Sequence, residues 1–136
     1  MPKPQSRMFL EHMIYYGKIL YLKDLWLPEV DDSEKIGYTS EEIQWAKENE
    51  EQVWRYFVER ELLFSNDTEL QSRFLFPAPF SKFYLELDNE TPAMLGHYIG
   101  CQMLRQYKDR TGADLQKILN APAEEIFKQS NYKPRK

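Results

Sequence analysis

Residues 11–28 read EHMIYYGKILYLKDLWLP and predict the first helix of the chain. Apolar residues recur at spacings of three and four through this stretch, so we expect a helix from about Ser6 to Leu25, and Pro28 helps to end it. Gly17 is unusual in the middle of such a helix, because glycine there costs roughly 1 kcal/mol relative to alanine. Two explanations are open: another backbone packs closely against Gly17, or the stretch is the altered remnant of a site.

A second helix is predicted to begin at Thr39 and to run to about Phe64. Thr39 and Glu42 have the spacing of a capping box, in which each side chain accepts a hydrogen bond from the other residue's backbone amide. The acidic stretch at residues 41–52 is expected to face solvent, whereas residues 28–38 are expected to form a loop with a turn at Gly37. The expected apolar face of this helix comprises Ile43, Val53, Trp54, Phe57, Val58 and Leu62.

The third long helix is predicted within residues 88–107, with Thr91 as its cap and Pro92 in its first turn. Gly96 and Gly100 lie one turn apart on one face of this helix. Such a pair lets a neighbouring helix approach closely, so we expect both glycines to pack against another helix. Gly112 is expected to end the helix.

Shorter elements complete the prediction. Two short helices are expected in residues 113–120 and 122–130, and a third after a cap at Asp67 or Thr68. Residues 77–87 contain two prolines and several aromatic side chains, which favours an ordered extended segment. The predicted fold is therefore mainly α, a single domain spanning residues 1–136 with about five or six helices and a Pro/Phe-rich extended segment.

Composition excludes several classes of protein. The 136 residues are 42% hydrophobic and 15% aromatic, which favours a folded interior. The formal net charge of −4 argues against nucleic acid as a partner. No apolar run is long enough to cross a membrane. Residues 1–10 resemble no signal peptide and contain no cysteine for lipid attachment.

The residues available for catalysis or metal binding are few. His12 and His97 are far apart in sequence, and Cys101 has apolar neighbours that favour a buried thiol. We therefore predict no catalytic residue, no metal site and no cofactor. The alternative is an interaction surface, for which three tryptophans are candidates. Trp54 is expected in the core because it lies on the apolar stripe. For Trp26 and Trp45 the sequence does not decide between the core and an interaction surface.

Four phrases together resemble a known family. They are MIYYGKILYLKDLWLP (13–28), IGYTSEEIQWAKENEEQVWRYFVERELLFS (36–65), PAPFSKFYLELDNETPAMLGHYIGCQMLRQY (77–107) and ILNAPAEEIFKQSNYKP (118–134). They resemble the C-terminal half of the gliding motility lipoprotein GldB family of Bacteroidetes. The resemblance implies a non-enzymatic component of a gliding or secretion apparatus, located at the periplasmic side of the cell envelope and bound to protein partners. Family members are longer, so the chain resembles a C-terminal fragment or a shortened relative.

The wider group resembles predicted zinc-dependent proteases, which carry H-E-x-x-H on one helix and a ligand in a Glu-Gly pair on a later one. Tyr16 and Gly17 stand where that pair would lie, so Tyr15, Tyr16, Gly17 and Ile19 are a candidate vestigial site or interface. The alternative function is the C-terminal half of a zincin-like metalloprotease whose metal-binding helix lies further upstream. The first helix is apolar on more than one face, and we expect Tyr15, Tyr16 or Ile19 to contribute to an exposed patch through which the chain forms a homo-oligomer.

Overall fold

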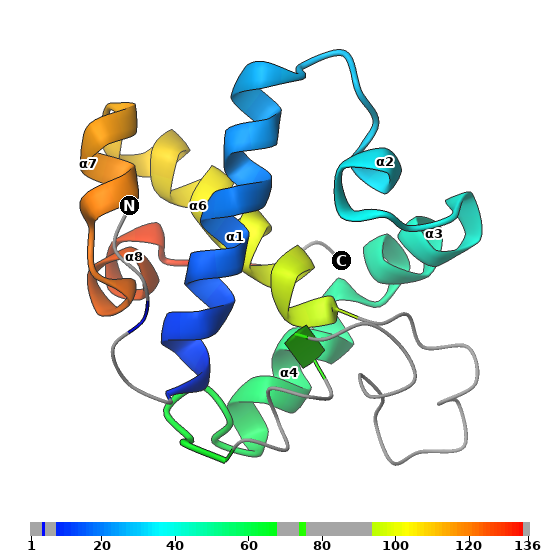
Figure 1. The fold of residues 1–136 in the computed structure, drawn as a ribbon. Coiled ribbons are helices and arrows are strands. Elements are labelled where there is room, and N and C mark those ends of the chain that lie inside the picture. The colour runs from blue at the N-terminus through cyan, green and yellow to red at the C-terminus, as the bar shows by residue number, and fades with distance from the viewer. Residues whose placement is uncertain (1–3, 5–7, 68–73, 76–93, 135–136) are drawn as a thin grey trace.

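A computed structural model describes Pro4 and residues 8–67, 74–75 and 94–134 (Figure 1). These residues form seven helices and no strand, which confirms the mainly α prediction. None of the described helices combines the length and hydropathy that a membrane span requires. The helices are α1 (Phe9–Trp26), α2 (Asp32–Ile36), α3 (Ser40–Glu48), α4 (Glu50–Glu59), α6 (Leu95–Thr111), α7 (Leu115–Asn120) and α8 (Ala123–Ser130).

The centre of the molecule is the crossing of α1 with α6, and α8 packs against both (Figure 1). Side chains at spacings of three and four on α1 turn toward this crossing, which explains why the 11–28 sequence is helical. Aromatic rings pack together in the core near the start of α1, where the Phe9 ring lies edge-on to the Phe57 ring with centroids 5.3 Å apart. The most buried side chains include Phe9, Leu10, Met13, Ile14, Phe57, Ile99, Met103, Leu104 and Tyr107.

The second predicted helix is divided into α3 and α4 at Asn49. The capping box at its start is confirmed: Thr39 Oγ1 accepts from the Glu42 amide at 3.1 Å, and Glu42 Oε1 accepts from the Thr39 amide at 2.9 Å. The predicted continuity is wrong, because Asn49 leaves the helical conformation with φ −114° and ψ 14°, and its side-chain amide joins its backbone amide in donating to the Trp45 carbonyl oxygen. Asparagine side chains compete in this way with the helical backbone.

The end of that helix also differs from the prediction. α4 ends at Glu59 instead of Phe64, and Glu61 then adopts a left-handed conformation with φ 55°. Val58 was expected on the apolar face, but 48% of its surface is exposed. Trp54 is half-buried and packs against the core.

Residues 28–38 were expected to be a loop, but they contain α2. Gly37 ends α2 in the left-handed region with φ 85°, which confirms the predicted turn. α2 has five residues, too few to be stable alone. Its buried Ile36 and the ion pairs of Lys35 attach it to the rest of the fold.

The remaining predictions divide into confirmed elements, elements outside the described residues and two wrong helix starts. Gly112 ends α6 with φ 66°, and α8 begins directly after Pro122, both as predicted. α7 begins after Asp114, whose carboxylate accepts from the Lys117 amide at 2.9 Å. The cap at Thr68 with its helix and the extended segment 77–87 lie outside the described residues. The predicted helix starts at Ser6 and Thr91 are wrong, because Met8 is extended and α1 begins at Phe9, and because Met94 is left-handed with φ 59° and α6 begins at Leu95.

Candidate functional site

Gly17 on α1 lies directly against Gly100 on α6. A Cβ added to Gly17 would lie 2.5 Å from the Gly100 carbonyl carbon and 2.8 Å from the Cys101 amide nitrogen. A Cβ added to Gly100 would clash with the Met13 carbonyl oxygen. At Gly96, one turn earlier, the nearest atom to an added Cβ would be Leu75 Cδ2 at 2.7 Å. The close approach of two helix backbones is therefore a sufficient physical reason for glycine at position 17.

The two tyrosines before Gly17 form an aromatic stack with a histidine. The Tyr16 ring lies parallel to the His97 imidazole, with centroids 4.4 Å apart and an interplanar angle of 5°, and Tyr15 lies edge-on to Tyr16 at 5.4 Å. Tyr15, Tyr16 and Ile19 are all half-buried, so their role as an exposed patch stays a prediction. The structure thus places Tyr16 against a ring on α6.

His97 is held as a neutral side chain in this stack. Burial lowers the pKa of His97 to about 4, and its Nε2 has no hydrogen-bond partner among the described residues. Cys101 is buried one turn further along α6, and burial raises the pKa of its thiol to about 12. His12 is half-buried on α1. Within the described ranges, no three His, Cys, Asp or Glu side chains converge as a metal site would require.

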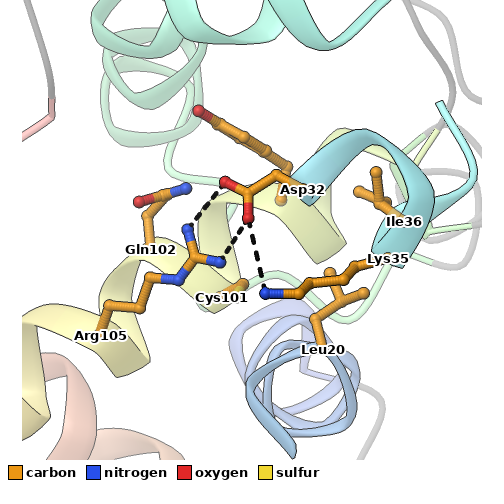
Figure 2. A pocket seen from close by; sticks show the side chains of 8 residues that line it. Leu20, Asp32, Lys35, Ile36, Cys101, Gln102 and Arg105 are labelled. Atoms are coloured by element: carbon orange, nitrogen blue, oxygen red, sulfur yellow. Dashed lines mark hydrogen bonds and ion pairs between the residues drawn. The ribbon is translucent and has the colours of Figure 1, made fainter. Parts of the chain in front are cut away.

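Four charged side chains join α1, α2 and α6, and we call them the Arg105 cluster: Asp24, Asp32, Lys35 and Arg105. Arg105 Nε and Nη2 each donate to Asp24 at 2.7 Å, while Nη1 and Nη2 donate to Asp32 at 3.1 and 2.8 Å. Lys35 Nζ donates to Asp24 at 2.9 Å. Figure 2 shows Arg105 reaching from α6 toward Asp32 on α2, with Lys35 on the other side of that carboxylate.

The Arg105 cluster satisfies its own charges. Burial alone would raise the pKa of Asp24, but the hydrogen bonds from Arg105 and Lys35 lower it below its usual value. The hydrogen bond from Arg105 is the main cause of the lowered pKa of Asp32. A small cavity between Leu20 and Arg105 adjoins the cluster and has a volume of about 20 Å³, room for about one water molecule. A second cavity, of about 400 Å³, is lined by Asp32 and Arg105 together with Glu50 and Lys133. The charges of the cluster are paired with one another, so its geometry suits the attachment of α2 to α1 and α6.

Other buried polar groups also face inward. Lys18 Nζ donates to the Leu119 and Ala121 carbonyl oxygens at 3.0 and 2.8 Å, which ties α1 to the end of α7, and burial lowers the pKa of Lys18 to about 8. Glu50 was expected to face solvent with the rest of the acidic stretch, but it is buried and accepts from the Tyr98 hydroxyl at 3.3 Å and from the Tyr132 hydroxyl at 2.5 Å. These contacts join segments that are distant in sequence, as expected of structural polar groups.

A stretch of three apolar residues at the end of α1 is the most exposed hydrophobic feature of the described residues. The exposed fractions are 46% for Leu25, 69% for Trp26 and 48% for Leu27, and we call these residues the Leu25–Leu27 surface. The end of α1 and the connection to α2 stand at the top of the molecule in Figure 1, away from α4 and α8. Trp45 is half-buried against the core, so of the two tryptophans that the sequence left open, only Trp26 faces solvent.

Sequence reasoning missed the Arg105 cluster, although a signal was present. Arg105 follows Tyr98 and Cys101 at spacings of seven and four on the predicted helix, so it shares a face with apolar residues. An arginine on a buried face needs carboxylate partners. The acidic residues of the expected loop were the nearest unassigned candidates.

The described residues form an all-helical scaffold with inward-facing polar groups and an exposed apolar surface at the end of α1. The chain belongs to the gliding motility protein GldB family, whose family model matches residues 1–134. It is accordingly a gliding-motility-related protein. No curated protein and no solved structure matches the chain, and these comparisons give no support to the resemblance to zinc-dependent proteases.

Proposed function

We propose that the chain is a non-enzymatic, protein-binding component of the gliding motility apparatus at the periplasmic side of the cell envelope. The observation that carries the proposal is membership of the GldB family over residues 1–134. The envelope location follows from the lipoprotein character of that family.

The Leu25–Leu27 surface supports the protein-binding part of the proposal. Tryptophan is enriched among the side chains that contribute most to protein interfaces, because it buries a large area at a small cost in side-chain entropy. Asp24, the residue directly before this surface, is fixed by Arg105 and Lys35. The helix end is therefore ordered before any partner binds, which lowers the entropic cost of association.

The shifted pKa values support a non-enzymatic role. Catalytic sites are built from groups whose pKa values are shifted and whose reactive atoms face a cleft. Here Lys18 donates to backbone carbonyls, Asp24 is held by Arg105, and the Cys101 thiol is buried and protonated. These groups are engaged in internal contacts that hold helices together.

Deletion of the gene in the bacterium that carries it tests the proposal. We expect cells that lack the protein to stop gliding on a surface and to recover when the wild-type chain is restored. Normal gliding of the deletion strain would contradict the proposal.

A further inference from the structure

We propose that the Leu25–Leu27 surface and the carboxylates that follow it form a docking site for a basic protein segment. Apolar side chains of this segment would cover Trp26, and its lysines and arginines would face Glu29, Asp31 and Glu34. The inference rests on the proposed protein-binding function and adds the chemistry of the partner.

The apolar part of the docking site consists of three consecutive residues and is held in place. Leu25, Trp26 and Leu27 are consecutive, and each exposes close to half of its surface or more. Backbone hydrogen bonds order the chain on both sides of Leu27, since its amide donates to the Lys23 carbonyl oxygen at 2.8 Å and its carbonyl oxygen accepts from the Val30 amide at 3.0 Å. A partner therefore meets a formed surface.

The acidic part of the site follows within eight residues of Trp26. Glu29, Asp31 and Glu34 are all exposed, and none of the three forms an ion pair with another described residue. Glu29 lies in the turn after Leu27, whereas Asp31 and Glu34 lie at the start of α2. These carboxylates are accessible to a partner in a way that the carboxylates of the Arg105 cluster are not.

The charge of the whole region is negative even with its cations included. Between positions 23 and 35 there are five carboxylates and two lysines, and Arg105 adds one positive charge from α6. Two negative charges remain uncompensated. Charge complementarity raises the association rate with a positive partner and disfavours partners of the same sign.

This charge decides between the occupants that an apolar helix end can have. An anionic lipid surface would be repelled by Glu29, Asp31 and Glu34. A second copy of the chain, docked through the same site, would bring like charges together, which costs free energy. A protein segment with apolar and basic side chains satisfies both parts of the site.

Site-specific photo-crosslinking tests the proposal in the full chain. A benzophenone amino acid replaces Trp26 in cells of the bacterium that carries the gene. The same amino acid at Val58 is the matched control, because Val58 is an exposed apolar residue too, at 48%, but lies on α4. We expect an adduct at position 26 that is absent at position 58, and a crosslinked peptide of net positive charge. An adduct with lipid, with a second copy or with an acidic or neutral peptide would overturn the inference, as would the absence of any adduct at position 26.

Binding of the purified partner then measures each half of the site. Trp26→Ser should weaken binding by about tenfold or more, and Val58→Ser should leave it unchanged. The combined reversal of Glu29, Asp31 and Glu34 to lysine should weaken binding to a similar extent, and raising the salt concentration from about 0.05 to about 0.5 M should weaken wild-type binding on the order of tenfold. Affinity that is independent of both the reversal and the salt would overturn the acidic part of the proposal.

Gliding of the complemented deletion strain separates this inference from the proposed function. If deletion abolishes gliding and the charge-reversed chain restores it fully, the docking inference fails and the motility function stands. If deletion leaves gliding intact, the motility function fails. A charge-reversed chain that accumulates normally but does not restore gliding supports both.

Discussion

Replacement of Gly17 or Gly100 by alanine should destabilise the protein, although alanine is the better helix former. Alanine alone would gain about 1 kcal/mol in the interior of a helix. A Cβ at Gly17 would lie 2.5 Å from the Gly100 carbonyl carbon, and the atoms in its way belong to the backbone, which cannot rotate aside. α1 and α6 must therefore move apart at the centre of the core. Overpacking of this kind costs about 1–3 kcal/mol and occasionally more, and a clash with backbone atoms belongs at the upper end, about 3 kcal/mol. Subtracting the gain of about 1 kcal/mol from helix propensity leaves a net loss of about 2 kcal/mol.

The size of the effect should follow the contact at each glycine. Gly100→Leu should cost more than Gly100→Ala, because a larger side chain must enter the same crossing. Gly96→Ala should cost less, since an added Cβ there meets the end of the Leu75 side chain at 2.7 Å and a single backbone atom, the Phe74 carbonyl oxygen, at 2.9 Å, a longer contact than the backbone contacts at Gly17. The double variant of Gly17 and Gly100 should cost less than the sum of the single variants, because one separation of the helices relieves both clashes.

Urea unfolding, followed by far-UV circular dichroism, measures these differences. For a domain of this size, a loss of about 2 kcal/mol lowers the urea midpoint by about 1 M. A midpoint that is unchanged or raised in Gly100→Ala, or strictly additive losses in the double variant, would refute the close packing of the two backbones.

Three further predictions concern charge, pH and association. Arg105→Met should lower the free energy of unfolding by about 1–3 kcal/mol near neutral pH, because it leaves two carboxylates without their main partner. The pKa of Asp24 is lowered below 3.8 in the folded state, so this loss should shrink as the pH falls below that value, which urea midpoints in acid can check. Burial lowers the pKa of His97 from 6.5 to about 4, so wild-type stability should fall as the pH falls from 6.5 toward 4, and the urea midpoint of His97→Phe should change less over that window. Sedimentation over a concentration series should show self-association that Tyr15→Ser or Ile19→Ser reduces; a monomer at every concentration would contradict the predicted patch.

Local sequence signals predicted the parts of the fold that are locally determined. The capping box at Thr39, the end of α6 at Gly112 and the start of α8 after Pro122 each follow from backbone chemistry within a few residues. The break at Asn49 is also local, and its signal is an asparagine whose side-chain amide can bond to the helical backbone. The apolar stripe continues past Asn49, so the hydrophobic pattern alone predicted one helix.

The features that were missed depend on contacts between distant residues. α2 is too short to be favoured by its own sequence, and it is held by Arg105, which lies 73 residues beyond Asp32. Likewise, a close neighbour was one of two explanations that the sequence left open for Gly17, and the sequence could not identify Gly100 as that neighbour. Exposure of Trp26 depends on how α2 and α6 are placed, so the sequence alone left it open.

Gliding by the deletion strain that expresses Trp26→Ser is the most direct test that the chain acts in motility by binding a protein through its exposed helix end. Trp26 is 69% exposed and lies outside the core, so the variant should fold and accumulate like the wild type, as immunoblotting can check. We expect that Trp26→Ser fails to restore gliding, whereas the control Val58→Ser restores it. Wild-type gliding speed with Trp26→Ser would contradict the account.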